Sequence, residues 1–300
     1  MTPHQDRRTI MNDSLPSAPD FLGAHMSISG GLHLAIDRAV AAGCGVLQIF
    51  TRNANQWKGK PVSDADVALF REKFAASGLH EIISHDIYLI NLAAPPGETR
   101  DKSLAAFRDE LETCARLGIA KVVMHPGSHL ADSPETGLER VVAAFDLLFS
   151  EVPQFEGRVL IETTAGQGSN LGRTFEELQA IISGSKFPGK FGVCFDTCHT
   201  FAAGYDTATA EGYADTMAQF ERLIGLERLQ CFHFNDSKKG LGSRVDRHEH
   251  IGQGALGLNP FRFILNDPRF VKIPKILETP KGDNDEMDAV NLGILRGLVG

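Results

Sequence analysis

The chain has 300 residues, of which 42% are apolar and 23% are charged, and its 38 acidic residues outnumber its 30 basic residues to give a formal charge of −8. This ordinary balance excludes collagen-like, low-complexity and disordered classes, and a chain of this length can bury a core without disulfides. The acidic excess also argues, at first sight, against nucleic-acid binding, because phosphate-binding domains are usually basic.

The sequence predicts no segment that would direct the protein into or across a membrane. No apolar run approaches the roughly 18 residues of a spanning helix, and residues 1–19 have no hydrophobic stretch of the kind found in secretory signals. Five scattered cysteines without a CxxC pair indicate reduced, buried thiols rather than a disulfide framework. We predict a cytoplasmic protein without membrane contact, with a flexible tail at residues 1–19 and one domain at residues 20–300.

From residue 20 onward, short apolar runs alternate with helical patterns at intervals of one βα unit. Eight runs predict strands: Phe21–Ala24, Val46–Phe50, Glu81–Ser84, Lys121–Met124, Val159–Ile161, Phe191–Phe195, Leu229–Phe232 and Pro274–Leu277. Helical spacing predicts helices that include Ser103–Gly118 and Ala214–Ile224, Ser133 is a predicted N-cap, and Thr174 with Glu177 is a predicted capping box. This pattern predicts a single (β/α)8 TIM barrel; a doubly wound sheet, the main alternative, often has a GxGxxG turn after its first strand, which is absent here.

Six consecutive predicted strands end in a residue that can bind a metal ion. They are His85, His125, Glu162, Asp196, His233 and Glu278. Because the carboxyl ends of barrel strands form one rim, we expect these side chains to converge on a metal site there. Three more candidates lie in the loops that follow, the last two in an unusually long loop: His199, Asp246 and His248.

Five imidazoles and four carboxylates without a thiolate suit zinc, with manganese or iron as alternatives. Nine ligands are too many for one tetrahedral ion and suit three ions that share carboxylates. Multi-metal sites hydrolyse phosphoesters because two ions clamp the attacking and the leaving oxygen. The residues favour a metal-dependent phosphodiesterase, and the alternatives are a metal-dependent sugar isomerase and an inactive lesion-binding protein.

Six motifs resemble the endonuclease IV family of apurinic/apyrimidinic (AP) endonucleases: GAHMSISGGL, SHDIYLINLA, HPGSHL, IETTAGQGSNLG, VCFDTCHTFAAGYD and HFNDSKKGLGSRVDRHEHIGQG. They extend from the first predicted strand almost to the last. The resemblance implies a TIM barrel with three zinc ions. Its implied ligand sets are His85, His125 and Glu162; Glu162, Asp196, His233 and Glu278; and His199, Asp246 and His248.

The resemblance also implies a reaction and a substrate. An activated water hydrolyses the phosphodiester 5′ to an abasic site in duplex DNA, with Glu278 and Glu162 as catalytic carboxylates, and leaves a 3′-hydroxyl and a 5′-deoxyribose phosphate. Blocked 3′ ends are a second expected substrate at the same site. We expect a monomer that is associated with the nucleoid during repair.

Recognition of a missing base must depend on DNA shape, because the ions contact phosphate and no base. The family bends DNA and flips the abasic nucleotide out, and Tyr88 and Leu89 match the positions that wedge into the minor groove. Further expected contacts lie in the loop TRNANQWKGK: Arg52, Asn55, Gln56 and Trp57. The family often has an arginine at the position of Asn55, and asparagine cannot fill the abasic gap in the same way, which leaves Arg52 as a candidate substitute.

The charge of −8 does not exclude DNA if metal occupies the rim. Four acidic residues are predicted ligands, and three divalent ions would offset most of the negative excess. Basic residues collect in two rim loops: Arg52, Lys58 and Lys60 in one, and Lys238, Lys239, Arg244 and Arg247 in the other. We therefore expect a positive strand-end face on the metal-loaded protein, and we expect metal removal to weaken DNA binding.

Overall fold

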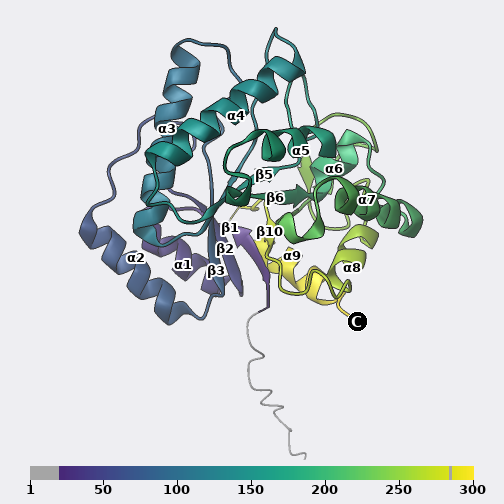
Figure 1. The fold of residues 1–300 in the computed structure, drawn as a ribbon. Helices are drawn as coiled ribbons and strands as arrows, with labels where there is room; N and C mark the ends of the chain where they lie inside the picture. Colours follow the sequence, from purple (N-terminus) through teal and green to yellow (C-terminus); the bar gives the residue numbers. More distant parts are fainter. Residues whose placement is uncertain (1–19, 284–285) are drawn as a thin grey trace, which may run out of the picture.

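The computed structural model describes residues 20–283 and 286–300, so the predicted tail lies outside the described residues. Within them, eight parallel strands close into a barrel in the order β1-β10-β7-β6-β5-β4-β3-β2 (Figure 1). The barrel strands are β1 (Leu22–His25), β2 (Val46–Phe50), β3 (Glu81–His85), β4 (Lys121–Met124), β5 (Arg158–Glu162), β6 (Phe191–Asp196), β7 (Leu229–Phe234) and β10 (Lys275–Leu277). The predicted TIM barrel is confirmed.

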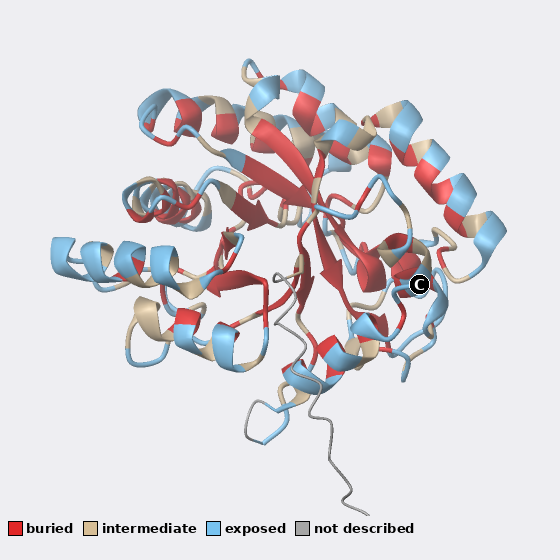
Figure 2. Cartoon of the chain, turned by 90° about the horizontal axis from the view of Figure 1, so that it is seen from below, coloured by how far each residue is buried: buried red, intermediate tan, exposed pale blue. Residues whose placement is uncertain are grey.

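Helices surround the barrel, with buried residues turned toward the strands and exposed residues on the outside (Figure 2). They are α1 (Leu32–Ala41), α2 (Asp64–Ser77), α3 (Glu98–Leu117), α4 (Pro134–Glu151), α5 (Phe175–Gly184), α6 (Thr197–Ala203), α7 (Ala210–Leu223), α8 (Asn259–Leu265) and α9 (Met287–Arg296). The remaining elements are the 3-10 turns η1 (Pro188–Lys190) and η2 (Leu226–Arg228) and an antiparallel pair, β8 (Asp236–Ser237) with β9 (His248–Glu249). In the part of the chain that the structure describes, no helix is both long and apolar enough to cross a bilayer.

Two helix starts follow the predicted caps, with one difference. Ser133 caps α4 and Thr174 caps α5 through their side-chain oxygens. The Glu177 carboxylate accepts the backbone N–H groups of Gly172 and Arg173 at 2.7 and 2.9 Å. Glu177 therefore closes the preceding loop rather than bonding back to the N-cap, and the predicted capping box is only half formed.

Some elements extend beyond the predicted bounds because backbone hydrogen bonding continues where the apolar pattern stops. Helix α3 begins at Glu98 rather than Ser103, since its first turn is polar. Strands β6 and β7 continue to Asp196 and Phe234. His233 therefore lies within β7, where it is paired with Asp196, rather than after the strand.

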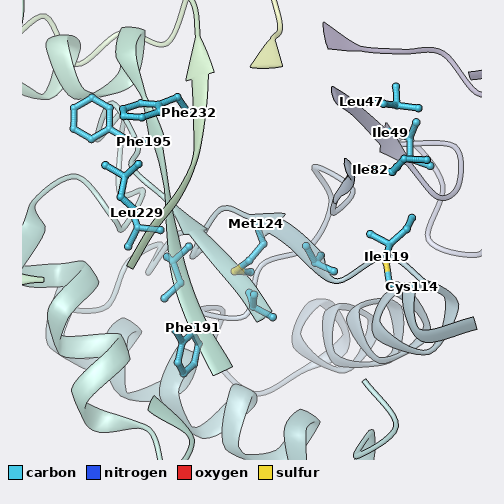
Figure 3. Close-up of a cluster of buried hydrophobic side chains, with 14 of the residues drawn as sticks. Leu47, Ile49, Ile82, Cys114, Ile119, Met124, Phe191, Phe195, Leu229 and Phe232 are labelled. Carbon is cyan, nitrogen blue, oxygen red and sulfur yellow. The ribbon is translucent and has the colours of Figure 1, made fainter. Parts of the chain in front are cut away.

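Among the described residues, apolar side chains form two separate buried clusters. The larger cluster packs between strands and helices and includes Phe191, Phe195 and Phe232 (Figure 3). The smaller one, which we call the interior cluster, contains Val46, Ile83, Val123, Leu160, Cys194, Cys231 and Ile276. These seven residues come from seven barrel strands and fill the barrel. All five cysteines are free and buried, as predicted.

Candidate metal centre

Every barrel strand contributes one side chain to a layer at the carboxyl ends of the strands. Since successive strand side chains alternate in direction, the next inward position lies two residues beyond each member of the interior cluster. Those positions are Gln48, His85, His125, Glu162, Asp196, His233 and Glu278, and His25 occupies the matching position on β1. We call these eight residues the rim layer; it contains all six of the ligands predicted at strand ends.

Glu162 lies at the centre of the rim layer and is fully buried. Its Oε2 atom is 3.2 Å from His85 Nε2 and 3.1 Å from His125 Nε2. Its Oε1 atom is 3.0 Å from His233 Nδ1 and 3.2 Å from His199 Nδ1. Four imidazoles thus converge on one carboxylate, and each of its two oxygens faces two of them.

A second group shares this carboxylate. Its members are Glu162, Asp196, His233 and Glu278, and one ligand atom from each lies within 4.8 Å of the others. His233 Nδ1 is 3.2 Å from Glu278 Oε2 and 4.0 Å from Asp196 Oδ2. This is the set predicted for the second ion.

A third group forms beside α6 from Asp196, His199 and His248, whose ligand atoms lie within 4.8 Å of one another. The predicted third set has Asp246 in place of Asp196, and Asp246 also lies beside both imidazoles. The Asp196 carboxylate caps α6 by accepting the backbone N–H of His199 at 2.7 Å, which positions His199 at the rim. Asp246 Oδ1 lies 3.1 Å from His199 Nε2 and 3.4 Å from His248 Nε2, and these two ring nitrogens are 3.3 Å apart. Two imidazole nitrogens at this separation need a proton or a cation between them.

The long loop after β7 folds back on itself and so brings His248 to the rim. The carboxylate of Asp236 accepts the backbone N–H groups of Gly254 and Leu256, both at 3.0 Å, and thereby ties the two ends of the loop together. A Cβ at Gly254 would lie 2.4 Å from the Ser237 carbonyl oxygen, so this close approach needs glycine. Loop length pointed to function, but the anchoring role of Asp236 was not predicted.

Gln48 is a site residue that sequence reasoning missed. Its Oε1 lies 2.8 Å from His233 Nε2, and its Nε2 donates to Glu278 Oε1 at 2.7 Å and lies 3.0 Å from His25 Nδ1. Asn235, also missed, accepts the backbone N–H of Glu278 at 3.0 Å. The signal in the sequence was a glutamine at an inward position of an otherwise apolar strand.

Backbone carbonyls fix two further imidazoles. His85 Nδ1 lies 2.7 Å from the carbonyl oxygen of Asp86, and His199 Nδ1 lies 2.9 Å from that of Thr163. An Nδ1–H that donates to a carbonyl leaves the Nε2 lone pair free for a ligand role. Both Nε2 atoms face carboxylates of the site.

The buried carboxylates are held in their charged form. Burial alone would raise the pKa of Glu162 and of Glu278, but the imidazoles around them, His233 foremost, lower both pKa values well below the usual range. Burial lowers the pKa of His25 to about 4, and its Nε2 has no hydrogen-bond partner among the described residues. Burial would lower the pKa values of the four imidazoles around Glu162, but the neighbouring carboxylates raise them. The rim therefore holds fixed carboxylates whose charge is balanced by protons on the imidazoles, and metal ions could take the place of those protons.

The donor set fits zinc. The three groups offer imidazole nitrogens and carboxylate oxygens, which are the borderline and hard donors that zinc accepts. Glu162, Asp196 and His233 are fully buried, whereas the side chains of His125 and Asp246 are 30% and 43% exposed. The latter two mark the side from which substrate can approach.

The predicted DNA-contacting residues differ in exposure. The side chain of Tyr88 is 64% exposed at the rim, and its ring packs edge-on against Phe50 with centroids 5.3 Å apart. Leu89 is half-buried against the core. Asn55 and Gln56 are exposed; these two residues and Tyr88 are available to a large ligand.

Trp57 and Arg52 are less available. Trp57 is half-buried and packs against the core. Arg52 is 7% exposed, and its guanidinium donates to Asp109 Oδ2 at 2.6 Å and to Glu110 Oε2 at 3.3 Å. The structure thus uses Arg52 to tie the loop after β2 to α3, and the basic charge of this residue is already paired.

Comparison with known proteins connects this geometry to two groups of barrel proteins. Residues 36–295 match the family model described as a xylose isomerase-like TIM barrel. Over 279 residues the chain is 78% identical to a protein of Trichlorobacter lovleyi named "Probable endonuclease 4", a match that covers 93% of this chain and 99% of that protein. The crystal structure of endonuclease IV from Thermus thermophilus is similar with a TM-score of 0.80 and 39% identity, covering 93% and 98% of the two chains.

A sugar-converting barrel is similar in fold alone. The crystal structure of a D-psicose 3-epimerase has a TM-score of 0.67 to this chain, with coverage of 93% and 99%. The sequence identity is only 16%, so this match shows a shared barrel fold alone.

Proposed function

Because the chain belongs to the endonuclease IV family of DNA-repair hydrolases, we propose that it hydrolyses the phosphodiester 5′ to an abasic site in duplex DNA, leaving a 3′-hydroxyl and a 5′-deoxyribose phosphate. The observation that carries this proposal is the convergence of three ligand groups on one rim, two of them sharing Glu162. The same site would remove blocking groups from 3′ ends. We further propose that the protein acts as a monomer in the cytoplasm.

We also propose that the clustered donor groups hold three zinc ions. His85, His125 and Glu162 would hold one ion; Glu162, Asp196, His233 and Glu278 a second; and His199, Asp246 and His248 a third. When bound, such ions supply positive charge for the phosphoryl group and generate a nucleophilic water at neutral pH.

Glu278 is the residue that we propose to orient and deprotonate the attacking water. Its side chain is 13% exposed, so it can reach both the buried group and the solvent side. Gln48 holds Oε1 by a hydrogen bond of 2.7 Å, which leaves Oε2 to face His233 and the reacting atoms. A carboxylate fixed in this way loses little entropy when it accepts the proton.

Selection of an abasic site would depend on exposed side chains beside the rim. Tyr88 stands out from the loop after β3 and is the candidate wedge, with Leu89 packed behind it as support. Asn55 and Gln56 would contact the backbone from the loop after β2. Because Arg52 is paired with two carboxylates, we do not assign it to the abasic gap.

A nicking assay tests the proposal. Purified protein should cut a duplex that contains one tetrahydrofuran abasic analogue, directly 5′ to the analogue, and the new end should be extended by a polymerase. An undamaged duplex of the same sequence is the control. Absence of incision by protein shown to carry three zinc ions would refute the proposal, and turnover of a ketose or aldose by such protein would favour the sugar isomerase instead.

A further inference from the structure

Two cysteines occupy adjacent places in the interior cluster, directly below the rim layer. Cys194 on β6 and Cys231 on β7 are paired in the strand register and are fully buried. Their five companions in the cluster are valine, isoleucine or leucine. Two thiols side by side are thus the only soft donors among the described residues of this layer.

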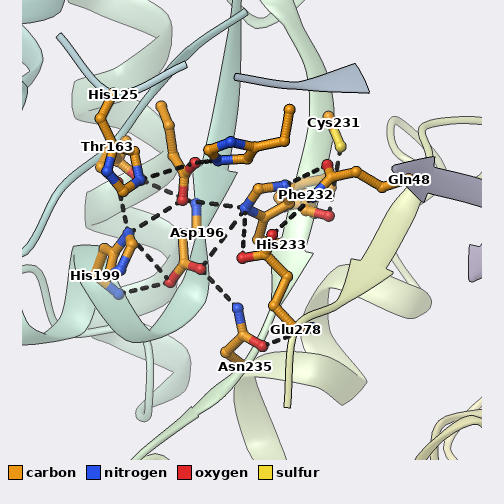
Figure 4. A network of polar contacts seen from close by, with 12 residues as sticks. Gln48, His125, Thr163, Asp196, His199, Cys231, Phe232, His233, Asn235 and Glu278 are labelled. Atoms are coloured by element: carbon orange, nitrogen blue, oxygen red, sulfur yellow. Dashed lines mark hydrogen bonds and ion pairs between the residues drawn. The ribbon is translucent and has the colours of Figure 1, made fainter. Parts of the chain in front are cut away.

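The two sulfur atoms have a third donor above them. His233 follows Cys231 on the same strand by two positions, so both side chains point inward (Figure 4). One ring nitrogen of His233 and the Sγ atoms of Cys194 and Cys231 all lie within 4.8 Å of one another. We propose that Cys194, Cys231 and His233 form a separate site for a soft, thiophilic metal ion such as Cd²⁺.

Donor chemistry selects this class of ion. Two sulfurs and one imidazole nitrogen favour soft ions over magnesium, calcium or manganese, which prefer oxygen. The three ligand groups at the rim, by contrast, offer only nitrogen and oxygen. The two levels of the barrel therefore differ in donor chemistry, since only the lower one offers sulfur, although they are one strand pleat apart.

Charge balance permits an ion at this depth. On binding, each thiol releases its proton to solvent, two sulfur–metal bonds form, and the imidazole lone pair fills a third position. One divalent ion with two thiolates has no net charge, so the apolar neighbours Val123, Leu160 and Ile276 do not face an uncompensated charge. The weak contact from Cys231 Sγ to the carbonyl oxygen of Phe232, at 3.6 Å, is the bond that this ion would replace.

Occupation of the sulfur site would disturb a ligand of the rim. His233 Nδ1 faces Glu162 and Glu278, and its Nε2 lies 2.8 Å from Gln48 Oε1. If either ring nitrogen binds an ion at the sulfurs, the ring loses one of the contacts that hold it in the second group. The site is therefore inhibitory, a consequence that rests on the proposed nuclease function. Binding of the soft ion itself does not depend on that function.

Ultraviolet titration of the purified protein with Cd²⁺ tests the site, because thiolate–cadmium bonds have a charge-transfer band that nitrogen and oxygen ligands lack. We expect the band to saturate at one ion per chain and to be lost in both Cys194→Ala and Cys231→Ala. Cys44→Ala, which removes another buried free thiol, and Cys198→Ala should keep it. Absence of the band in the unaltered protein, or its loss only in Cys198→Ala, would overturn the proposal.

Cadmium-113 NMR of the unaltered protein provides a second measurement that needs no variant. The chemical shift reports how many sulfurs bind the ion, and two are expected; a spectrum with only nitrogen and oxygen ligands would overturn the proposal even if the variants fail to fold. In nicking assays, Cys231→Ala should need at least about tenfold more cadmium for half-inhibition than Cys44→Ala. Equal sensitivity would refute competition for His233 and would leave the spectroscopic result standing.

Discussion

Replacement of Gln48 by methionine tests whether the rim layer depends on the amide that contacts both His233 and Glu278. Methionine is similar in volume but cannot bond to His233 Nε2 at 2.8 Å or to Glu278 Oε1 at 2.7 Å. In this variant His233 Nε2 would have no hydrogen-bond partner, and water cannot reach it because His233 is fully buried. Water can replace the lost bond to Glu278, because the Glu278 side chain is partly exposed. We expect the free energy of unfolding to fall by about 2–4 kcal/mol, since an orphaned buried group costs about 1–3 kcal/mol beyond the lost bond.

The effect on activity should exceed what destabilisation explains. Loss of a group that orients metal ligands lowers affinity or activity by about 10–100-fold, so kcat for nicking an abasic duplex should fall by that factor in Gln48→Met. Leu47→Ala is the matched control, because Leu47 is the adjacent buried residue and packs in the larger cluster outside the barrel; it should lose about 2–5 kcal/mol of stability but keep kcat per folded molecule. Urea unfolding, zinc analysis and nicking rates measure the three quantities. A Gln48→Met protein with full zinc and a near-normal kcat would refute the reasoning.

Four further predictions follow from other parts of the structure. Glu278→Gln should bind the abasic duplex normally but cut it about 10²–10⁴-fold more slowly, because the water loses its base; a normal single-turnover rate would contradict this role. Tyr88→Ala should weaken binding of the abasic duplex about tenfold without changing the unfolding curve. The control is Leu241→Ala, which removes another exposed side chain from a rim loop and should bind the duplex normally. Equal losses of affinity in gel-shift assays would argue against a role of Tyr88 as the wedge. Burial lowers the pKa of Lys275 to about 8, below the value of about 10.5 in the unfolded chain. Between these two pH values the unfolded chain binds more protons than the folded chain, so the free energy of unfolding should rise with pH by up to about 3 kcal/mol. Urea titrations of Lys275→Met should lack this rise, and parallel pH curves for the two proteins would contradict the prediction. Protein stripped of metal by a chelator should lose affinity for the abasic duplex as well as nicking activity, and unchanged affinity would mean that the charge of the rim does not depend on metal.

Predictions from the sequence succeeded where a local pattern controls the outcome. The β-branched and aromatic runs form barrel strands because they fill the interior and the helix-facing side at once, and Ser133 and Thr174 act as caps because their hydroxyls meet the next turn. Strand ends were less accurate. Asp196 and His233 are polar, so the apolar pattern stops before them, although their backbones remain in the ladder.

Partners from distant parts of the chain could not be predicted. Gln48 bonds to residues that follow it by 185 and 230 positions, and only barrel closure brings them together. Arg52 was predicted to contact DNA because its loop is basic, but this prediction could not take account of α3. That helix supplies two carboxylates that pair with the guanidinium. Composition reveals which charges a loop contains, and packing decides which of them remain available.

The ring of strands has a consequence for how activity arises during folding. Glu278 directly follows β10, which pairs with β1 across the closure of the barrel, with Leu22 in register with Lys275. Contacts so distant in sequence form late, since the chain must lose loop-closure entropy before they stabilise it. A barrel that is open at this seam lacks its last carboxylate and the strand partners that align it. Nuclease activity should therefore appear in refolding experiments only after β1 and β10 pair. Partly folded chains would then not cut DNA.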